Sequence, residues 1–501
     1  MVDSESVKSS YPKSITTSAQ DDRGSMEKKQ SVQQRVDSFE SGEVETVIDK
    51  NIEKSALKKM DLVISPIIGF LYLMAFLDRS NIGNASVAGM SDSLKLYNER
   101  FNVAISIFYV LYILVETPSV ILVKYVRPSR MLAFISLAWS IVVLSSGFVS
   151  SYGGLIITRL ILGLLEGCLF PALSLYLTTV YSREEQCQRL SYLFCASGLA
   201  GAFGGLFAYA LEQVHVGNMA GWQWIYIVEG LISFIGVPLS LFLLPDNIEK
   251  SWFLNPQERQ VARLRNEANL RYLGQQKFDW QEVRKSFKDP KIYVSAVSQF
   301  CADMVLYGFS SFLPTIVKDL GFTGLQSNYM TIPVYVSGVL AFLVVAYASD
   351  RTKIRSPFLI SASLVSAVGY VILIASNSNA AKFTACFIVA IGCYIGPGMN
   401  LGWLNNNVAG HYKRATAIGI QQTIANSSGI IAGQIYQSKS APRYILGHSF
   451  TLGCVLVGLI GYIVLLFSLR YANNKRDERC ARGMFDPTLT GDYADDFRYF
   501  L

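Results

Sequence analysis

The sequence has little charge. Only 16% of its 501 residues are Asp, Glu, Lys or Arg, whereas 51% are hydrophobic. A soluble chain of this length would divide into several domains and carry charge on about a quarter of its residues. The deficit leaves too little charged surface for a soluble protein of this size.

Histidine is scarce, and cysteine shows no pattern. The three histidines are scattered through short polar stretches, and the eight cysteines mostly lie inside apolar runs without a Cys-x-x-Cys pair. These absences argue against a metal-ligand cluster, a zinc site and a disulfide framework. No nucleophile, base and orienting group share a recognisable motif either, so we expect neither an enzyme nor a bound metal or organic cofactor.

Long apolar stretches fill the chain from Asp61 onward, each close to the ~20 residues that a helix needs to cross hydrocarbon. We count twelve, six on either side of the polar segment from Asp246 to Pro290. They begin near Leu62, Phe101, Met131, Gly153, Leu190 and Trp222 and, in the second half, near Ile292, Gln326, Pro357, Lys382, Ala415 and Ser449. The sequence therefore predicts an all-α membrane protein of twelve transmembrane helices arranged as two six-helix bundles.

The polar segments divide the chain into five parts. Without a long apolar run, the first of these is predicted to be disordered. The predicted order is a cytoplasmic tail over residues 1–60, a bundle over 61–245, a linker over 246–290, a second bundle over 291–471 and a tail over 472–501.

The links between spans indicate a duplication and an orientation. The basic link after the second span (Lys124, Arg127, Arg130) corresponds, at an offset of about 227 residues, to that after the eighth (Arg351, Lys353, Arg355), as in a transporter built from parallel repeats. Lys and Arg are more frequent in the even-numbered links than in the odd-numbered ones, which predicts cytoplasmic termini and a cytoplasmic linker. The net charge of +7 is then mostly an orientation signal, and we expect no nucleic-acid partner.

Several ionisable side chains lie inside predicted spans, where they are costly and usually face a cavity or a partner. They are Asp78, Arg79, Glu116, Arg159, Glu166, Glu229 and Asp303. Arg79 and Arg159 fall at similar predicted depth, and two guanidinium groups in a low-dielectric cavity favour an anion such as a carboxylate. A buried acid beside them can hold a proton. Each of these residues could instead form a structural ion pair, and for Glu116 and Glu229 the two interpretations are equally open.

Amide side chains mark the second half. Gln422 and Asn426 lie on one face of the eleventh span, and Asn400 follows the Gly396-Pro397-Gly398 break in the tenth. Such amides suit hydrogen bonding to a polar substrate but also join helices. The glycines of the fifth span, from Gly198 to Gly205, are typical of close helix packing.

Three motifs resemble a known family. Asp78-Arg79-Ser80-Asn81-Ile82-Gly83-Asn84-Ala85, the run from Arg159 to Gly167, and Gly221-Trp222-Gln223-Trp224-Ile225 look like the fungal allantoate permease group of anion:cation symporters, in the major facilitator superfamily. The resemblance implies a proton-coupled importer of organic anions, and members carry nicotinate, pantothenate, biotin, allantoate, cysteine or small peptides. The chain departs from the pattern where the link after the second span lacks its usual acid and where Gln223 stands in place of Arg.

Together these readings predict three groups of site residues. Substrate contacts are expected from Arg79, Arg159, Asn426, Gln422, Asn400 and Tyr112, proton coupling from Asp78, Glu166 and Asp303, and gating from Arg127, Arg130, Asp350 and Arg351. The coupling ion is a proton, and the partners are a small organic anion and the lipid bilayer.

The predicted protein works as a monomer in the plasma membrane, with a vacuolar or endoplasmic reticulum membrane as the alternative location. A drug:proton antiporter and a non-transporting nutrient sensor remain alternative functions. The antiporter is disfavoured because the run from Gly198 to Gly205 contains no proline.

Overall fold

The computed structural model describes residues 49–483, 491–495 and 497–501, apart from residues 98, 182, 215–218 and 274–279. Every regular element in these residues is a helix. The N-terminal segment predicted to be disordered, up to residue 48, lies outside the described residues.

The first bundle contains six spans. Its elements are α2 (Lys50–Ala85), α4 (Arg100–Tyr125), α5 (Pro128–Ser146), α6 (Tyr152–Glu166) with α7 (Leu169–Val180), α8 (Arg183–Leu211), and α9 (Gly221–Ser233) with α10 (Gly236–Pro238) and η2 (Leu239–Leu243). A π-helical turn, η1 (Ser86–Met90), and α3 (Ser91–Ser93) follow α2.

The second bundle repeats this order. Its elements are α13 (Pro290–Asp319), α14 (Gly324–Thr352), α15 (Ser356–Ala375), α16 (Asn379–Cys393) with α17 (Ile395–Asn406), α18 (His411–Asn426) with α19 (Ser428–Ile435), and α20 (Ile445–Ala481). The linker forms η3 (Ile248–Lys250), α11 (Pro256–Leu273) and α12 (Trp280–Lys288).

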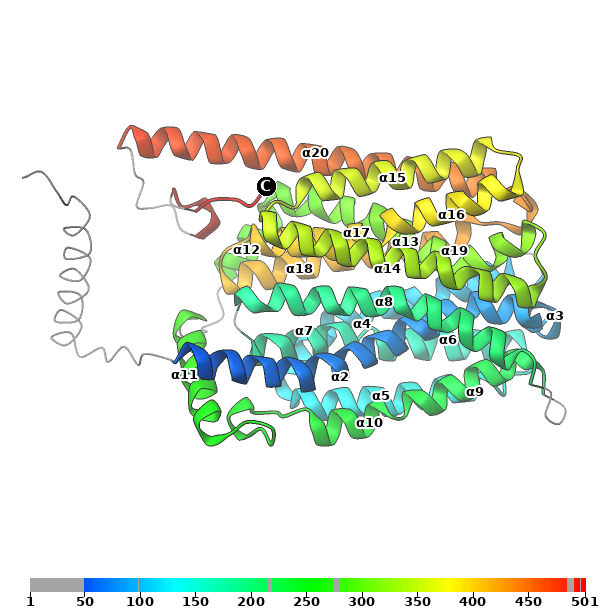
Figure 1. The fold of residues 1–501 in the computed structure, drawn as a ribbon, viewed down its shortest axis with the longest axis horizontal. Helices are drawn as coiled ribbons and strands as arrows, with labels where there is room; N and C mark the ends of the chain where they lie inside the picture. Colours follow the sequence, from blue (N-terminus) through cyan, green and yellow to red (C-terminus); the bar gives the residue numbers. More distant parts are fainter. Residues whose placement is uncertain are drawn as a thin grey trace, which may run out of the picture.

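The predicted all-α membrane architecture is confirmed. Ten helical stretches among the described residues are long and apolar enough to cross a membrane. Helix α4 and the pair α18 and α19 run alongside them in Figure 1 and bring the described spans to the twelve expected. The helices overrun two predicted boundaries, because α2 begins at Lys50 and α20 continues to Ala481.

Three spans are interrupted near residues of interest. The fourth breaks between Glu166 and Leu169, the tenth at Tyr394, two residues before the predicted Gly396 break, and the eleventh at Ser427, directly after Asn426. Irregular backbone at membrane depth is tolerated only where protein or a cavity surrounds it. The interruptions therefore place Glu166 and Asn426 in the protein interior.

The two bundles meet at the end of the molecule opposite α11 and α12, here called the loop end (Figure 1). A Cβ atom on Gly205 of α8 would lie 2.6 Å from the backbone oxygen of Asn328 in α14, and one on Gly201 would lie 2.6 Å from the Tyr335 ring. The Asn102 amide donates to the backbone oxygen of Tyr436 at 3.1 Å. The glycines of α8 thus serve close packing, as the sequence predicts.

The C-terminal residues 491–495 and 497–501, here called the strap, pack against the second bundle at its linker end. Asp492 accepts hydrogen bonds from Lys413 (2.8 Å) and Lys291, and Lys413 also binds Asp289 at 2.8 Å. Arg476 of α20 donates to the backbone oxygens of Asp492 (2.6 Å) and Phe497 (2.8 Å). The strap therefore connects α20 to the starts of α13 and α18.

The strap should loosen in acid. Burial on its own raises the pKa of Asp289, but the ammonium groups of Lys291 and Lys413 outweigh it, so this pKa lies below its usual value. A lowered pKa gives stabilisation that is complete above about pH 4 and is lost as the pH falls through the folded-state value. We expect the protection of the backbone amides in residues 497–501, measured as their exchange rate relative to the intrinsic rate at the same pH, to fall on acidification below about pH 4.

Two matched variants test the cluster of Asp289 with Lys291 and Lys413 at neutral pH. Asp289→Asn should accelerate this exchange, whereas Asp477→Asn should not, because Asp477 forms an exposed pair with Arg498, of the kind worth about 0–1 kcal/mol. Equal exchange rates in both variants would contradict a role for the Asp289 cluster.

Candidate functional site

An ion pair buried in the first bundle forms the centre of the site. Nε of Arg79, in α2, donates to Oε2 of Glu166, at the end of α6, over 2.7 Å. The Glu166 side chain is fully buried and that of Arg79 is 9% exposed. The guanidinium carbon lies 4.6 Å from the centre of the Tyr112 ring, with the rings of Phe76 and Phe108 at 4.8 and 5.3 Å. These aromatic faces hold the arginine in one position and add cation–π attraction.

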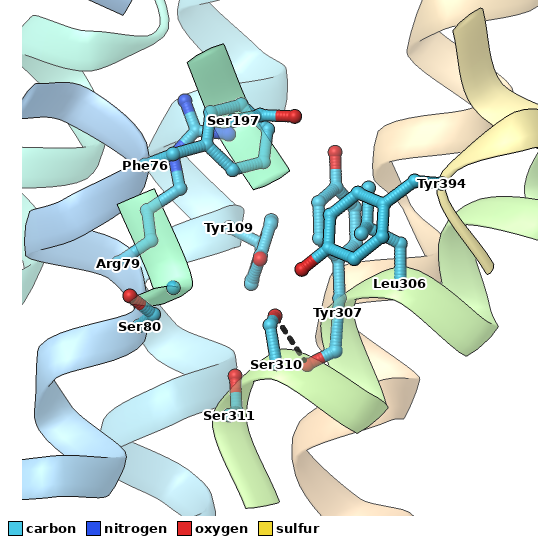
Figure 2. Close-up of a pocket in the computed structure, with 11 residues that line it drawn as sticks. Phe76, Arg79, Ser80, Tyr109, Ser197, Leu306, Tyr307, Ser310, Ser311 and Tyr394 are labelled. Carbon is cyan, nitrogen blue, oxygen red and sulfur yellow. Dashed lines mark hydrogen bonds between the residues drawn. The ribbon is translucent and has the colours of Figure 1, made fainter. Parts of the chain in front are cut away.

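Arg79 also faces a cavity between the two bundles (Figure 2). In this conformation the cavity is nearly closed: the free space between its side chains is about 10 Å³, room for about one water molecule, so a larger occupant requires the lining side chains to move apart. The first bundle lines it with Phe76, Arg79, Ser80, Tyr109, Ser197 and Gly201, and the second with Leu306, Tyr307, Ser310, Ser311 and Tyr394. One cation, several hydroxyl groups and flat aromatic rings therefore converge on one space. Such a lining can take a small anion with an apolar or aromatic body.

The structure separates the two arginines that the sequence pairs. Arg159 donates through Nη1 to the backbone oxygen of Asp78 at 3.2 Å and through Nη2 to the Tyr226 hydroxyl at 2.8 Å. The first contact places both arginines at the same level of the bundle, as the depth estimate predicts. Arg159 is not among the residues lining the cavity, so its predicted substrate contact is not seen in this conformation.

A second polar network crosses between the bundles. The Asn426 amide nitrogen donates to both carboxylate oxygens of Glu116, at 3.1 and 3.0 Å, and its oxygen accepts from the Tyr307 hydroxyl at 2.8 Å. Tyr307 lines the cavity. The structure therefore brings Asn426 to the edge of the site. It also includes Glu116, whose role the sequence leaves open.

Two other predicted residues lie together inside the second bundle. Asn400 donates to the Gln299 side chain (2.8 Å) and to the backbone oxygen of Ser295 (3.0 Å). Gln299 in turn donates to Asp303 at 3.3 Å. Neither Asn400 nor Asp303 lines the cavity, and the Asn400 amide is occupied by contacts that join α13 to α17. By contrast, Nε2 of Gln422 is buried with no hydrogen-bond partner in the described part of the chain.

The predicted gating residues stay within their own bundles. Arg127 lies 3.8 Å from Asp246, which also accepts a hydrogen bond from Ser129 at 2.6 Å. The link after the second span lacks the acid that is usual in the family. Asp246, which follows η2 in the chain, provides a carboxylate beside that link instead. In the second bundle Asp350 pairs with Arg355 at 3.4 Å and Arg351 lies over the Tyr347 ring.

Arg130, the remaining gating residue, is exposed. Within the described residues, no ion pair joins the gating residues of the first bundle to Asp350 of the second. Their gating role stays a prediction for a conformation in which the linker end is closed.

Sequence reasoning missed several neutral partners of the charged residues. Trp139 donates to Asp78 at 2.7 Å, and Tyr226 accepts from Arg159. Tyr394 enters the cavity from the α16–α17 break. The only feature in the sequence that marks these residues is an aromatic side chain with a polar group inside a spanning helix. Such side chains are common in ordinary helix packing as well as in binding sites.

A cavity between two six-helix bundles, with an arginine, serines and tyrosines on its wall, defines a membrane transporter. The chain belongs to the Major Facilitator Superfamily, whose family model matches residues 68–433.

Similar proteins agree with this family. The chain is 76% identical over 454 residues to an uncharacterized transporter of Schizosaccharomyces pombe, with 91% of each chain covered. It is 36% identical over 432 residues to the high-affinity nicotinic acid transporter of Saccharomyces cerevisiae, covering 86% of this chain and 81% of the relative. A bacterial homologue of the human lysosomal transporter Spinster, crystallised inward-facing and occupied, shares the fold with a TM-score of 0.60 at 12% identity, covering 81% of this chain and 96% of that one.

The contact between Asn426 and Glu116 can be measured as a coupling energy. Asn426→Ala leaves a buried carboxylate without its donor and should lower the free energy of unfolding by about 1–3 kcal/mol. Adding Glu116→Leu removes the stranded acid, so the double variant should lose less than the sum of the single losses. Reversible unfolding in mixed micelles gives the three values, and strictly additive losses would show that the two residues do not interact.

Proposed function

We propose that this transporter imports a small organic carboxylate together with a proton, as a member of the anion:cation symporter group. The observation that carries the proposal is the Arg79–Glu166 pair at the wall of the central cavity. Arg79 is a cation facing the cavity, and its counter-ion is an acid that can be neutralised by a proton.

Competition for Arg79 couples the two ions. A substrate carboxylate entering the cavity can take the place of Glu166 on the guanidinium group, where bidentate contact is favourable. Glu166 then has no counter-ion in a fully buried position, and an unpaired buried carboxylate is costly enough to take up a proton. Proton and substrate therefore bind together or not at all, which is the requirement for symport.

The shape and lining of the cavity favour a flat substrate. Tyr109, Tyr307 and Tyr394 present aromatic rings, and Ser310 and Ser311 present hydroxyl groups (Figure 2). A planar ring carrying one carboxylate can stack on such rings while it binds Arg79. Nicotinate has this form, and the relation to a nicotinic acid transporter supports it as first choice. Pantothenate, biotin and allantoate are the competitors to be ruled out.

The proposal also includes the predicted setting, which is a single chain in the plasma membrane with cytoplasmic termini. In that setting the linker end faces the cytoplasm, and the bundles meet on the outer side. The contacts at the loop end then describe a carrier that is closed to the outside.

Uptake of labelled nicotinate tests the proposal in cells that lack their own nicotinate uptake. We expect uptake to rise at acid outside pH, to collapse with a protonophore, and to be competed by the true substrate in a panel of the four carboxylates. Uptake that ignores both pH and protonophore would overturn proton coupling, and uptake of none of the four would overturn the substrate class.

Arg79→Lys tests the anion contact. Lysine keeps the charge but loses the planar fork, so uptake should fall by about tenfold or more, which corresponds to a loss of about 1.4 kcal/mol or more. Arg263→Lys is the matched control, because Arg263 is 66% exposed, lies on the linker helix α11 and does not line the cavity. With equal amounts of both variants at the cell surface, unchanged uptake in Arg79→Lys would remove Arg79 from the substrate site.

A further inference from the structure

A pair of buried acids, Asp78 and Glu229, lies in the first bundle behind Arg79. The predicted proton-coupling residues include Asp78 but not Glu229. Asp78 of α2 is 1% exposed and Glu229 of α9 is fully buried. Helices α2 and α9 pack side by side, and the two carboxyl groups interact with each other.

These carboxyl groups have too few hydrogen-bond donors. Oδ2 of Asp78 accepts from the Trp139 indole, but Oδ1 of Asp78 and both oxygens of Glu229 have no partner among the described residues. An ionised carboxylate buried in this way costs several kcal/mol unless it is paired and hydrogen-bonded. Both groups therefore cannot carry a full negative charge without a donor between them.

The Asn81 amide interacts with Glu229 and can donate to one of its oxygens, but the surrounding charges supply no donor between the two carboxyl groups. From the elements packed around Glu229, the charged or titratable neighbours are Asp78, Arg159 and, one turn earlier on α9, Tyr226. Arg159 donates hydrogen bonds to the Asp78 backbone oxygen and to the Tyr226 hydroxyl, and neither of these goes to a carboxylate. Glu166 adds a further negative charge on the Asp78 side.

One cation beside two carboxyl groups leaves one negative charge in excess. A single proton held between Oδ1 of Asp78 and an oxygen of Glu229 removes this excess and gives two of the three orphaned oxygens a hydrogen bond, and the unpartnered amide nitrogen of Asn81, which interacts with Glu229, can donate to the third. Arg159 then balances the one remaining charge. This assignment satisfies the charge balance and the hydrogen-bonding requirement together.

We propose that Asp78 and Glu229 share one proton and form a proton-binding site of this transporter, separate from the Arg79–Glu166 pair on which the substrate acts. The role in coupling rests on the proposed symport function. Asp78 directly precedes Arg79 on α2, so a movement of α2 that accompanies substrate binding at Arg79 also changes the distance between Asp78 and Glu229. The shared proton can leave when this contact opens, and no bond other than the O–H bond is made or broken.

Infrared spectroscopy tests the shared proton without any substrate. The full-length protein is reconstituted in lipid at neutral pH, and the carbonyl bands of protonated carboxyl groups are compared between variants. Glu229→Gln and Asp78→Asn should each remove the same single band, and the double variant should remove no more. A control, Glu267→Gln, changes a solvent-accessible acid of the linker helix α11 that pairs with Arg263 and should leave that band intact.

The opposite results are equally clear. Two different bands removed by the two single variants, with both missing in the double variant, would show two separate protons. No band removed by either variant would show that the pair is ionised. Either result overturns the proposal.

Transport of labelled nicotinate tests the coupling role. In Glu229→Gln, stimulation of net uptake by outside acid should fall well below the several-fold effect expected of the unchanged protein, because the pair no longer needs a proton and only Glu166 still takes one up. Exchange of external for preloaded nicotinate should persist, since it requires no net proton movement. Glu267→Gln should retain the stimulation.

Net uptake that is stimulated by acid in Glu229→Gln as strongly as in the unchanged protein would overturn this role, and so would loss of exchange together with net uptake at normal surface levels. If the unchanged protein itself takes up no nicotinate, the proposed function fails, whereas the infrared result still decides whether the proton is shared.

Discussion

The buried ion pair between Arg79 and Glu166 constrains the whole first bundle. A guanidinium group in a low-dielectric interior must keep a counter-charge within contact distance, so α2 and the end of α6 must stay close together. The packing of α6 meets this requirement. A Cβ atom on Gly163 would lie 2.0 Å from the backbone oxygen of Phe108, so α6 approaches α4 as closely as glycine allows. That approach places the side chain of Glu166 within reach of Arg79.

The same constraint separates two sites along a single dipeptide. Consecutive residues on a helix point about 100° apart. Arg79 therefore faces the cavity while the Asp78 side chain points into the bundle toward Trp139. One helix thus presents a cation to the cavity and an acid to a protected interior, and in the proposed mechanism these bind the substrate and a proton respectively. A motion of α2 acts on both, and the two ions need not meet in order to be coupled.

The sequence predicts the number of spans, the two halves and the buried ionisable residues, because each depends on local composition. Apolar runs give the spans, and a charge inside a run is conspicuous wherever the chain folds. It does not predict partners that come from tertiary packing. Glu116 and Asn426 are 310 positions apart, and nothing local identifies them as partners. Asn400 has the same local character as Asn426, yet only the packing of α17 against α13 shows that its amide is occupied.

The distribution of charge also explains how the bundles can move relative to each other. Near the linker end, the ion pairs join residues of the same bundle to each other or to the linker. Arg265 of the linker helix α11, for example, binds Glu53 and Glu185 of the first bundle at 2.6 Å each. At the loop end, most contacts between bundles are made by glycines, amides and backbone oxygens, such as that from Ser106 to the oxygen of Ile430 at 2.7 Å, and one carboxylate, that of Glu212, accepts from the Asn328 amide at 3.1 Å. Neutral hydrogen bonds contribute only about 0.5–1.5 kcal/mol each, because water replaces them when they open. Charged contacts therefore keep each bundle rigid. If the protein works by the proposed alternating access, the interface at the loop end opens by exchanging mostly neutral contacts for water.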